Sequence, residues 1–193
     1  MFMNPFELPT SLLVGDVEHP IRTDYRDILY ILSIFSDPDY ESDERGVICL
    51  RVMFPDWRQI PPEQYRAALE AASAFIDGPL PPDSGGHEHG KRPRVMDWQQ
   101  DAGLIIPAVN RVVGTEVRAL EYMHWWTFLG AYMEIGDCLY STVLSIRQKR
   151  AKGKKLETYE QAFYKANRAL VDLRKQQTEQ DAQRKEALKK LFV

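Results

Sequence analysis

Residues 122–150 read YMHWWTFLGAYMEIGDCLYSTVLSIRQKR and form the longest stretch of the chain with apolar side chains at helical spacing. Apolar residues recur every three or four positions, and further apolar side chains widen the stripe. This pattern predicts one helix from Tyr122 to Arg150. A helix that is apolar on so much of its circumference belongs at the centre of the fold. Gly130, Ala131 and Gly136 predict that a neighbouring helix approaches it closely.

The N-terminal side of the chain predicts a small hairpin followed by helices. Residues 8–22 alternate in short apolar and polar groups around Gly15-Asp16, so SLLV is expected to pair with HPIR. From Thr23, which can serve as the N-cap, the apolar spacing becomes helical until Asp37-Pro38. The run VICLRVMF at 47–54 is compatible with a short buried strand or with a helix.

A further helix is expected to open at Pro61-Pro62 and to close at Gly78-Pro79. Its predicted apolar face contains Tyr65, Ala68, Leu69, Ala72 and Phe75.

Residues 78–94, GPLPPDSGGHEHGKRPR, concentrate Gly and Pro and predict a flexible linker loop. The linker divides the chain into an N-terminal part (1–77) with the hairpin and helices and a helical core (95–173) with the His-Trp-Trp helix. A basic polar helix or tail (174–193) follows, and the whole is expected to form one folded domain. Within the linker, His87-Glu88-His89 lacks a third ligand at a recognisable spacing, so we predict no metal site.

Two more helices are expected after the linker. Asp97 and Gln100 resemble a capping box before a helix that Pro107 bends or divides and Gly114 ends. A last apolar stripe over 156–173 predicts one more helix, while residues 174–193 contain few apolar anchors. The predicted fold class is therefore mainly α (α+β): a helical bundle around one long central helix, with a small N-terminal β-hairpin.

The composition fits a globular protein with two differently charged ends. The 193 residues are 44% hydrophobic and 27% charged, and the net charge is −3. Residues 147–193 contain 14 Lys and Arg against 6 Asp and Glu, whereas residues 1–146 contain 11 against 22. The small net charge is thus the sum of +8 and −11, a distribution that favours charged contacts between proteins as much as binding to nucleic acid.

The cysteines and the hydropathy pattern indicate a soluble protein of a reducing cytoplasm. Cys49 and Cys138 lie 89 positions apart in apolar surroundings, and we expect two buried thiols without a disulfide. The sequence shows neither a signal peptide nor about 18 uninterrupted apolar residues, the length of a membrane span.

No catalytic motif stands out. The sequence lacks GxSxG, a Walker loop, a dinucleotide-binding glycine motif and HExxH, so we expect no enzymatic activity and no cofactor. His124, at a helix start, is interpreted as a packed or capping residue. The candidates for partner binding are an aromatic set and a basic set: Trp98, Trp125, Trp126, Arg147, Lys149 and Arg150.

Three segments resemble the phage gene-product-fifteen family of siphophage and prophage tail-gene regions. They contain Asp97, Trp98 and Asp101, then His124, Trp125, Trp126 and Phe128, then Ile146 and Arg147 before a basic turn. The opening LLVGDVEHPIRTDYRDILYILSIFSDPD also fits the family, so the resemblance covers nearly the whole chain.

The resemblance implies a tail assembly chaperone, a protein that coats the long helical tape measure protein and recruits tail tube subunits in the host cytoplasm. The implied partners are the tape measure protein, the tail tube protein, a companion tail chaperone and further copies of this chain. Two alternatives stay open: a nucleic-acid-binding phage protein that uses the basic C-terminal segment, and a structural component of the virion tail.

Overall fold

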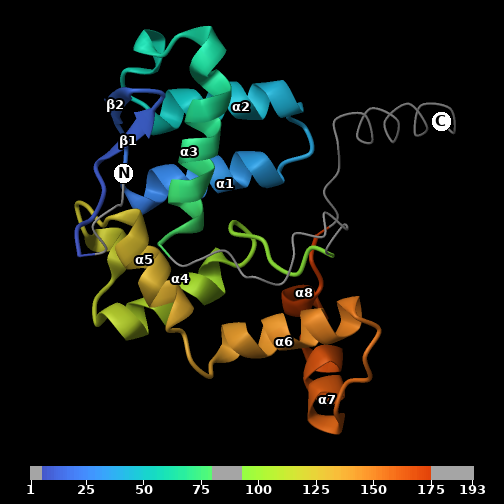
Figure 1. Ribbon diagram of the computed structural model, residues 1–193. Coiled ribbons are helices and arrows are strands. Elements are labelled where there is room, and N and C mark those ends of the chain that lie inside the picture. Colours follow the sequence, from blue (N-terminus) through green and yellow to red (C-terminus); the bar gives the residue numbers. More distant parts are fainter. Residues whose placement is uncertain (1–5, 80–92, 175–193) are drawn as a thin grey trace, which may run out of the picture.

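The computed structural model describes residues 6–79 and 93–174, and this part of the chain is mainly helical with one small hairpin (Figure 1). The predicted fold class, mainly α with a small β element, is confirmed. In chain order the strands and α-helices are β1 (Ser11–Val14), β2 (Val17–Pro20), α1 (Tyr25–Ser36), α2 (Ser42–Met53), α3 (Tyr65–Asp77), α4 (Ala102–Val113), α5 (Trp125–Met133), α6 (Leu139–Ala151), α7 (Thr158–Ala166) and α8 (Arg168–Val171).

The hairpin turns at Gly15-Asp16 and contains the predicted first strand, but its second strand begins two residues earlier than predicted. β1 and β2 are antiparallel, with Ser11 opposite Pro20 and Val14 opposite Val17. Gly15 turns the chain with φ +61°, and a Cβ there would lie 3.1 Å from the side chain of Gln64. The strand that pairs with β1 is VEHP (Val17–Pro20), and not the expected HPIR.

Asp24, not Thr23, caps α1. The Asp24 carboxylate accepts a hydrogen bond from the backbone N–H of Arg26 at 2.9 Å. Thr23 instead has its hydroxyl 2.7 Å from that of Tyr122, and its carbonyl accepts from the backbone N–H of Trp125 at 2.7 Å. These contacts join the start of α1 to the start of α5.

The VICLRVMF run lies in a helix, α2, which settles the alternative that the sequence leaves open. Its start is stabilised by reciprocal bonds between Glu41 and Glu44, and Cys49, Leu50 and Met53 are buried. Helix α1 contacts α2, and α2 contacts α3, which crosses them in Figure 1. Helix α3 ends at Gly78, as predicted, where φ is +90°.

The prediction of one central helix from Tyr122 to Arg150 is wrong, because two helices occupy this segment. Helix α5 ends at Met133, and α6 begins after Cys138. The backbone N–H of Cys138 donates to Ser141 Oγ at 2.9 Å, while Cys138 Sγ accepts from the Ser141 N–H at 3.5 Å. This reciprocal cap starts a new helix within an unbroken apolar pattern.

The close approach predicted at the small residues is not observed at the two glycines, whereas Ala131 packs against the core. A Cβ placed on Gly130 or Gly136 would meet no heavy atom within 4 Å. Cys138, expected to be a buried thiol, is half-buried, and its sulfur takes part in the cap of α6.

Helix α4 contains Pro107 without being divided by it, and it ends at Gly114 with φ +81°. Asp97 accepts from the backbone N–H of Gln100 at 2.6 Å, but this turn precedes the helix, which begins at Ala102. The single helix expected over 156–173 is divided at Asn167 into α7 and the short α8.

The larger core cluster takes buried side chains from both sides of residues 80–92, among them Ile28, Met53, Phe75, Ile105 and Phe128. A small second cluster joins Val143, Ile146 and Val171. Most of the predicted linker (80–92 of 78–94), with its His87-Glu88-His89 group, lies outside the described residues, so its predicted flexibility stays a prediction. The same holds for residues 175–193 of the predicted tail. Within residues 6–79 and 93–174, no helix is long and apolar enough to cross a membrane.

Candidate functional site

Two of the three tryptophans predicted to bind a partner lie in the core. Trp125 is 1% exposed and Trp126 is 9% exposed. Their indole N–H groups donate to the carbonyls of Ile76 (2.9 Å) and Phe75 (2.8 Å) at the end of α3. Because a buried indole N–H needs an acceptor, this pair joins α5 to α3. Neither indole is accessible to a partner in this structure.

Trp98 is the half-buried member of the aromatic set. Its ring stands edge-on to that of Trp125, with centroids 6.3 Å apart, and lies 5.1 Å from that of Tyr132. Trp98 also lines a polar pocket at the surface. It alone of the three predicted tryptophans combines core packing with access to a surface hollow.

His124 is the N-cap of α5, in line with the sequence interpretation. Its Nδ1 accepts from the backbone N–H of Trp126 at 3.0 Å, so the proton lies on Nε2, which donates to the carbonyl of Pro9 at 3.0 Å. The side chain is buried between these partners. Both ring nitrogens are thus engaged in holding α5.

Arg147, one of the predicted surface cations, is also buried. Its guanidinium makes a bidentate ion pair with Asp101, at 2.7 and 2.9 Å. It donates in addition to the backbone carbonyls of Val95, Leu170 and Val171. Arg147 therefore fastens α6, α8 and the segment before α4 together.

The other two predicted cations have intramolecular partners. Lys149 Nζ lies 2.7 Å from a carboxylate oxygen of Glu160, a residue that is 2% exposed, and this hydrogen bond holds the Glu160 pKa below its ordinary value. Arg150 pairs with Asp172 and lies over the Tyr164 ring, 4.1 Å from its centroid.

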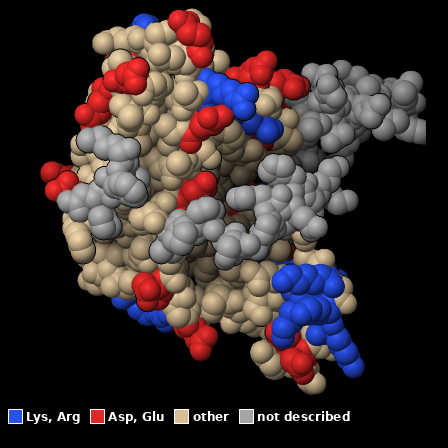
Figure 2. Space-filling view, in the orientation of Figure 1, with Lys and Arg blue, Asp and Glu red and all other residues tan. Residues whose placement is uncertain are grey.

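The exposed basic surface is made by other residues. Lys152, Lys154 and Lys155, at the α6–α7 turn, are exposed. Figure 2 shows Lys and Arg side chains gathered over α6 and α7.

The described residues contain an apolar groove that no pattern in the sequence predicts. It has a volume of about 360 Å³ and lies between α1, α2 and α3. Its lining consists of Leu32, Phe35, Ser42, Gly46, Cys49, Leu69, Ser73, Ile76 and Asp77. Periodicity predicts α1 and α3 and leaves α2 open between strand and helix, and it cannot show that the apolar faces of the three helices leave a gap.

The floor of the groove is tightly packed. A Cβ on Gly46 would lie 3.3 Å from a methyl group of Leu69, so the glycine lets α2 and α3 approach. Cys49 is buried beneath it, and burial raises the pKa of its thiol to about 11. A thiol with that pKa is an inert apolar wall at neutral pH rather than a nucleophile. Phe35, at the edge, is 44% exposed.

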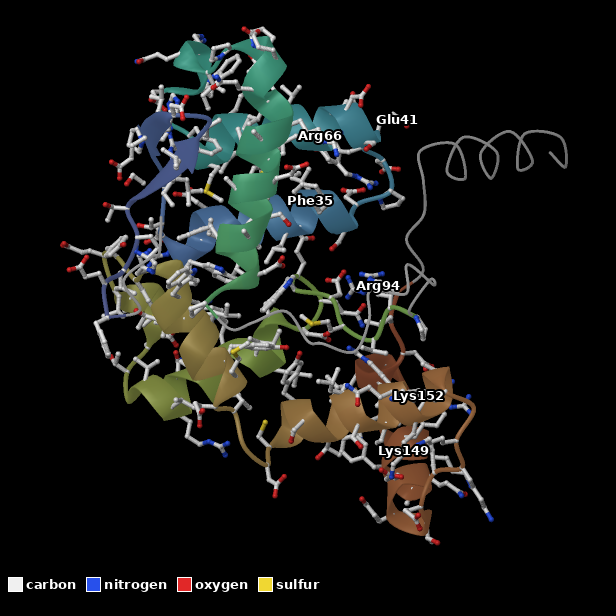
Figure 3. The ribbon with its side chains drawn as sticks, viewed as in Figure 1. Phe35, Glu41, Arg66, Arg94, Lys149 and Lys152 are labelled. Carbon is white, nitrogen blue, oxygen red and sulfur yellow. The ribbon has the colours of Figure 1, made fainter. Side chains whose placement is uncertain are left out.

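Acidic residues flank the groove. Residues 36–46 contain five carboxylates and a single arginine, and Asp77 lines the groove itself. Figure 3 places Phe35 on α1 and Glu41 at the beginning of α2, on the same side of α3. The groove therefore combines an apolar floor with an acidic border, by which we mean Asp77 in its wall and the adjoining segment 36–46, where carboxylates outnumber cations five to one.

A second hollow, of about 350 Å³, is polar. Its lining comes from the end of α1, the segment before α4 and the end of the described chain: Ser33, Ser36, Asp37, Pro38, Asp39, Arg94, Asp97, Trp98, Gln99, Gln100 and Arg174. In Figure 3, Arg94 lies between the α1–α3 group and the α6–α8 group. The Arg174 N–H donates to the Gln100 side chain at 2.9 Å.

Neither hollow contains a recognisable catalytic constellation. Across residues 6–79 and 93–174, no group of three or more His, Cys, Asp or Glu side chains could hold a metal ion. The chemistry that the groove offers is binding: apolar contact along its floor and attraction of cations at its border.

The comparison with known proteins gives the family. No curated protein and no solved structure is significantly similar to this chain. A family model described as Bacteriophage Gp15 protein matches residues 7–173 and thus nearly all of the described part. The chain belongs to the bacteriophage Gp15 family, as the resemblance of its three segments predicts.

Proposed function

We propose that this phage protein is a non-enzymatic tail assembly chaperone that transiently binds a helical segment of the tape measure protein or the tail tube protein. The observation that carries the proposal is the groove between α1, α2 and α3. In an isolated chain this groove leaves apolar side chains uncovered, and an amphipathic helix laid into it would bury them.

The groove defines the chemistry of its partner. The apolar floor accommodates two or three side chains that recur at i, i+3 and i+4 on one helix face. The acidic border favours Lys or Arg beside these anchors. Tape measure proteins are long and helical, so such segments suit the proposed role.

This mechanism differs from the one that the sequence alone suggests. Trp125, Trp126 and Arg147 hold the fold together, and a partner would meet the groove instead. The exposed Lys152, Lys154 and Lys155 form a separate basic surface for a second partner, such as an acidic face of a companion chaperone or of another copy. The proposed site of action is the host cytoplasm.

Co-expression with the adjacent tape measure and tube proteins, followed by pull-down at moderate salt, tests the proposal. We expect capture by the wild-type chain and loss of capture in Ser73→Arg, which puts a positive charge into the groove. Ala67→Arg is the matched control, because Ala67 is exposed on the same helix outside the groove. If the wild-type chain captures neither protein, or if both variants behave alike, the proposal is wrong.

The exposed lysines also support a second candidate, binding of nucleic acid. A salt titration with random-sequence DNA separates the two, because phosphate contacts give a steep loss of affinity with rising salt. An assembly chaperone is expected to bind little DNA at any salt concentration. Mass spectrometry of purified particles tests the third possibility, that the protein stays in the virion.

A further inference from the structure

The apolar groove between α1, α2 and α3 leaves apolar side chains accessible whenever no partner is bound. Leu32, Leu69 and Ile76 are only half-buried, and Phe35 is exposed beside them. A hollow with an apolar floor is a place where an apolar helix face can bind. The sequence itself contains a segment suited to cover it.

That segment is residues 184–193, RKEALKKLFV, at the end of the printed sequence. Leu188, Leu191 and Phe192 recur at i, i+3 and i+4, the spacing that puts three apolar side chains on one face of a helix. The segment has four Lys or Arg and a single Glu. It has the anchors and the charge that we infer for a partner of the groove.

The charges of the two surfaces are complementary. Asp77 lies in the groove wall, and Ser42 and Gly46 of the wall belong to segment 36–46, which contains five carboxylates against the single cation Arg45. A basic amphipathic helix is attracted to such a border, and an acidic one is repelled.

The described chain ends close to the groove. Arg174 lines the polar pocket together with Ser33 and Ser36 of α1, whose neighbours Leu32 and Phe35 line the groove. Nine residues separate Arg174 from residue 184, and nine extended residues span about 30 Å. The segment can therefore reach the groove of its own chain.

We propose that residues 184–193 bind as an amphipathic helix in the groove of their own chain and cover it until a tail protein displaces them. The displacement step rests on the proposed function, whereas the intramolecular contact does not. A partner must then bind more tightly than the chain's own segment, which restricts capture to segments that match the groove well.

A reporter thiol in the groove tests the contact in the full-length chain. Ser73→Cys in a Cys138→Ser background places the thiol in the groove wall, and Ala67→Cys places a control thiol on the outside of α3. The rate of modification by a soluble thiol reagent is measured with and without Leu188→Glu/Leu191→Glu. The protein without a reporter corrects for Cys49.

We expect the double substitution to speed modification at position 73 by about tenfold. A segment that is bound about nine-tenths of the time leaves the groove open for about one tenth, and its release opens the groove fully. No change is expected at position 67. An unchanged rate at 73, or an equal rise at both positions, overturns the proposal. Protection that disappears on dilution also overturns it, because the occupant is then the segment of a second copy.

This experiment fails independently of the pull-down. Protection of position 73 without capture of a tail protein leaves the intramolecular contact standing and removes the proposed function. Capture that depends on Ser73, without protection of position 73 by residues 184–193, supports the proposed function and removes the intramolecular contact.

Discussion

The guanidinium of Arg147 and the carboxylate of Asp101 form a buried, bidentate ion pair between residues 46 positions apart in the sequence. The side chains are 4% and 1% exposed, respectively. Each of them comes from a different segment of those that carry the family resemblance. The segments that carry the family resemblance thus include both residues of one structural contact, which joins α6 to the start of α4.

The first prediction concerns this pair. Arg147→Met leaves the Asp101 carboxylate buried without its cation, and we expect the free energy of unfolding to fall by about 3–5 kcal/mol. Urea denaturation followed by circular dichroism measures the change. Lys152→Met, on the exposed end of the same segment, is the control and should stay within about 0.5 kcal/mol of wild type. Equal midpoints for the two variants would contradict a structural role.

The second prediction concerns Trp126, whose indole N–H donates to the carbonyl of Phe75. Trp126→Phe keeps an aromatic ring but removes this hydrogen bond. The carbonyl retains the bond from the backbone N–H of Gly78 at 3.2 Å, so we expect a loss of about 0.5–1.5 kcal/mol, the net value of one hydrogen bond. Capture of a tail protein should be unchanged below the unfolding temperature, since the residue lies outside the groove. Loss of capture by a folded Trp126→Phe protein would instead support the prediction from the sequence that the aromatic set binds the partner.

Helical periodicity predicts where helices lie better than it predicts their ends or their exposure. The apolar spacing continues through Gly136, Asp137 and Cys138, so it gave one helix where there are two. The signal for the break is the reciprocal cap between Cys138 and Ser141, and cysteine is not a residue that marks an N-cap.

The candidate site was harder to predict for a related reason. Trp125 and Trp126 have the spacing of a stripe, and a stripe can face the core or a partner. The two indoles face the core because their N–H groups donate to the carbonyls of Ile76 and Phe75, which lie about 50 positions earlier in the sequence. The groove similarly depends on how three helices cross, which no local pattern contains.

The third prediction is a dependence of stability on pH at Glu160. The hydrogen bond from Lys149 lowers the Glu160 pKa in the folded protein, so the unfolded state binds a proton more readily. The contribution of this carboxylate is therefore complete above pH 4.5 and is lost as the pH falls through the lower, folded pKa. The difference in unfolding free energy between wild type and Glu160→Gln should narrow below pH 4.5.

Glu63→Gln serves as the control for this measurement, because Glu63 is exposed and lies on the 3₁₀ turn before α3. Its urea midpoint should follow that of the wild type at every pH between 3 and 7. If the difference in unfolding free energy between wild type and Glu160→Gln stays constant across this range, the Lys149 contact does not shift the ionisation of Glu160.

The fourth prediction separates the two thiols by their surroundings. Cys49 is 2% exposed and its pKa is about 11, so at pH 8 roughly one thiol in a thousand is ionised, and the sulfur is also shielded from reagent. Cys138 is half-buried at the start of α6.

A soluble disulfide reagent at pH 8 should therefore titrate one thiol quickly and a second only after urea is added. Cys138→Ser should remove the fast phase, and Cys49→Ala should leave it intact. If the fast phase instead disappears in Cys49→Ala, the floor of the groove opens in solution far more than the packing of Leu69 against Gly46 allows.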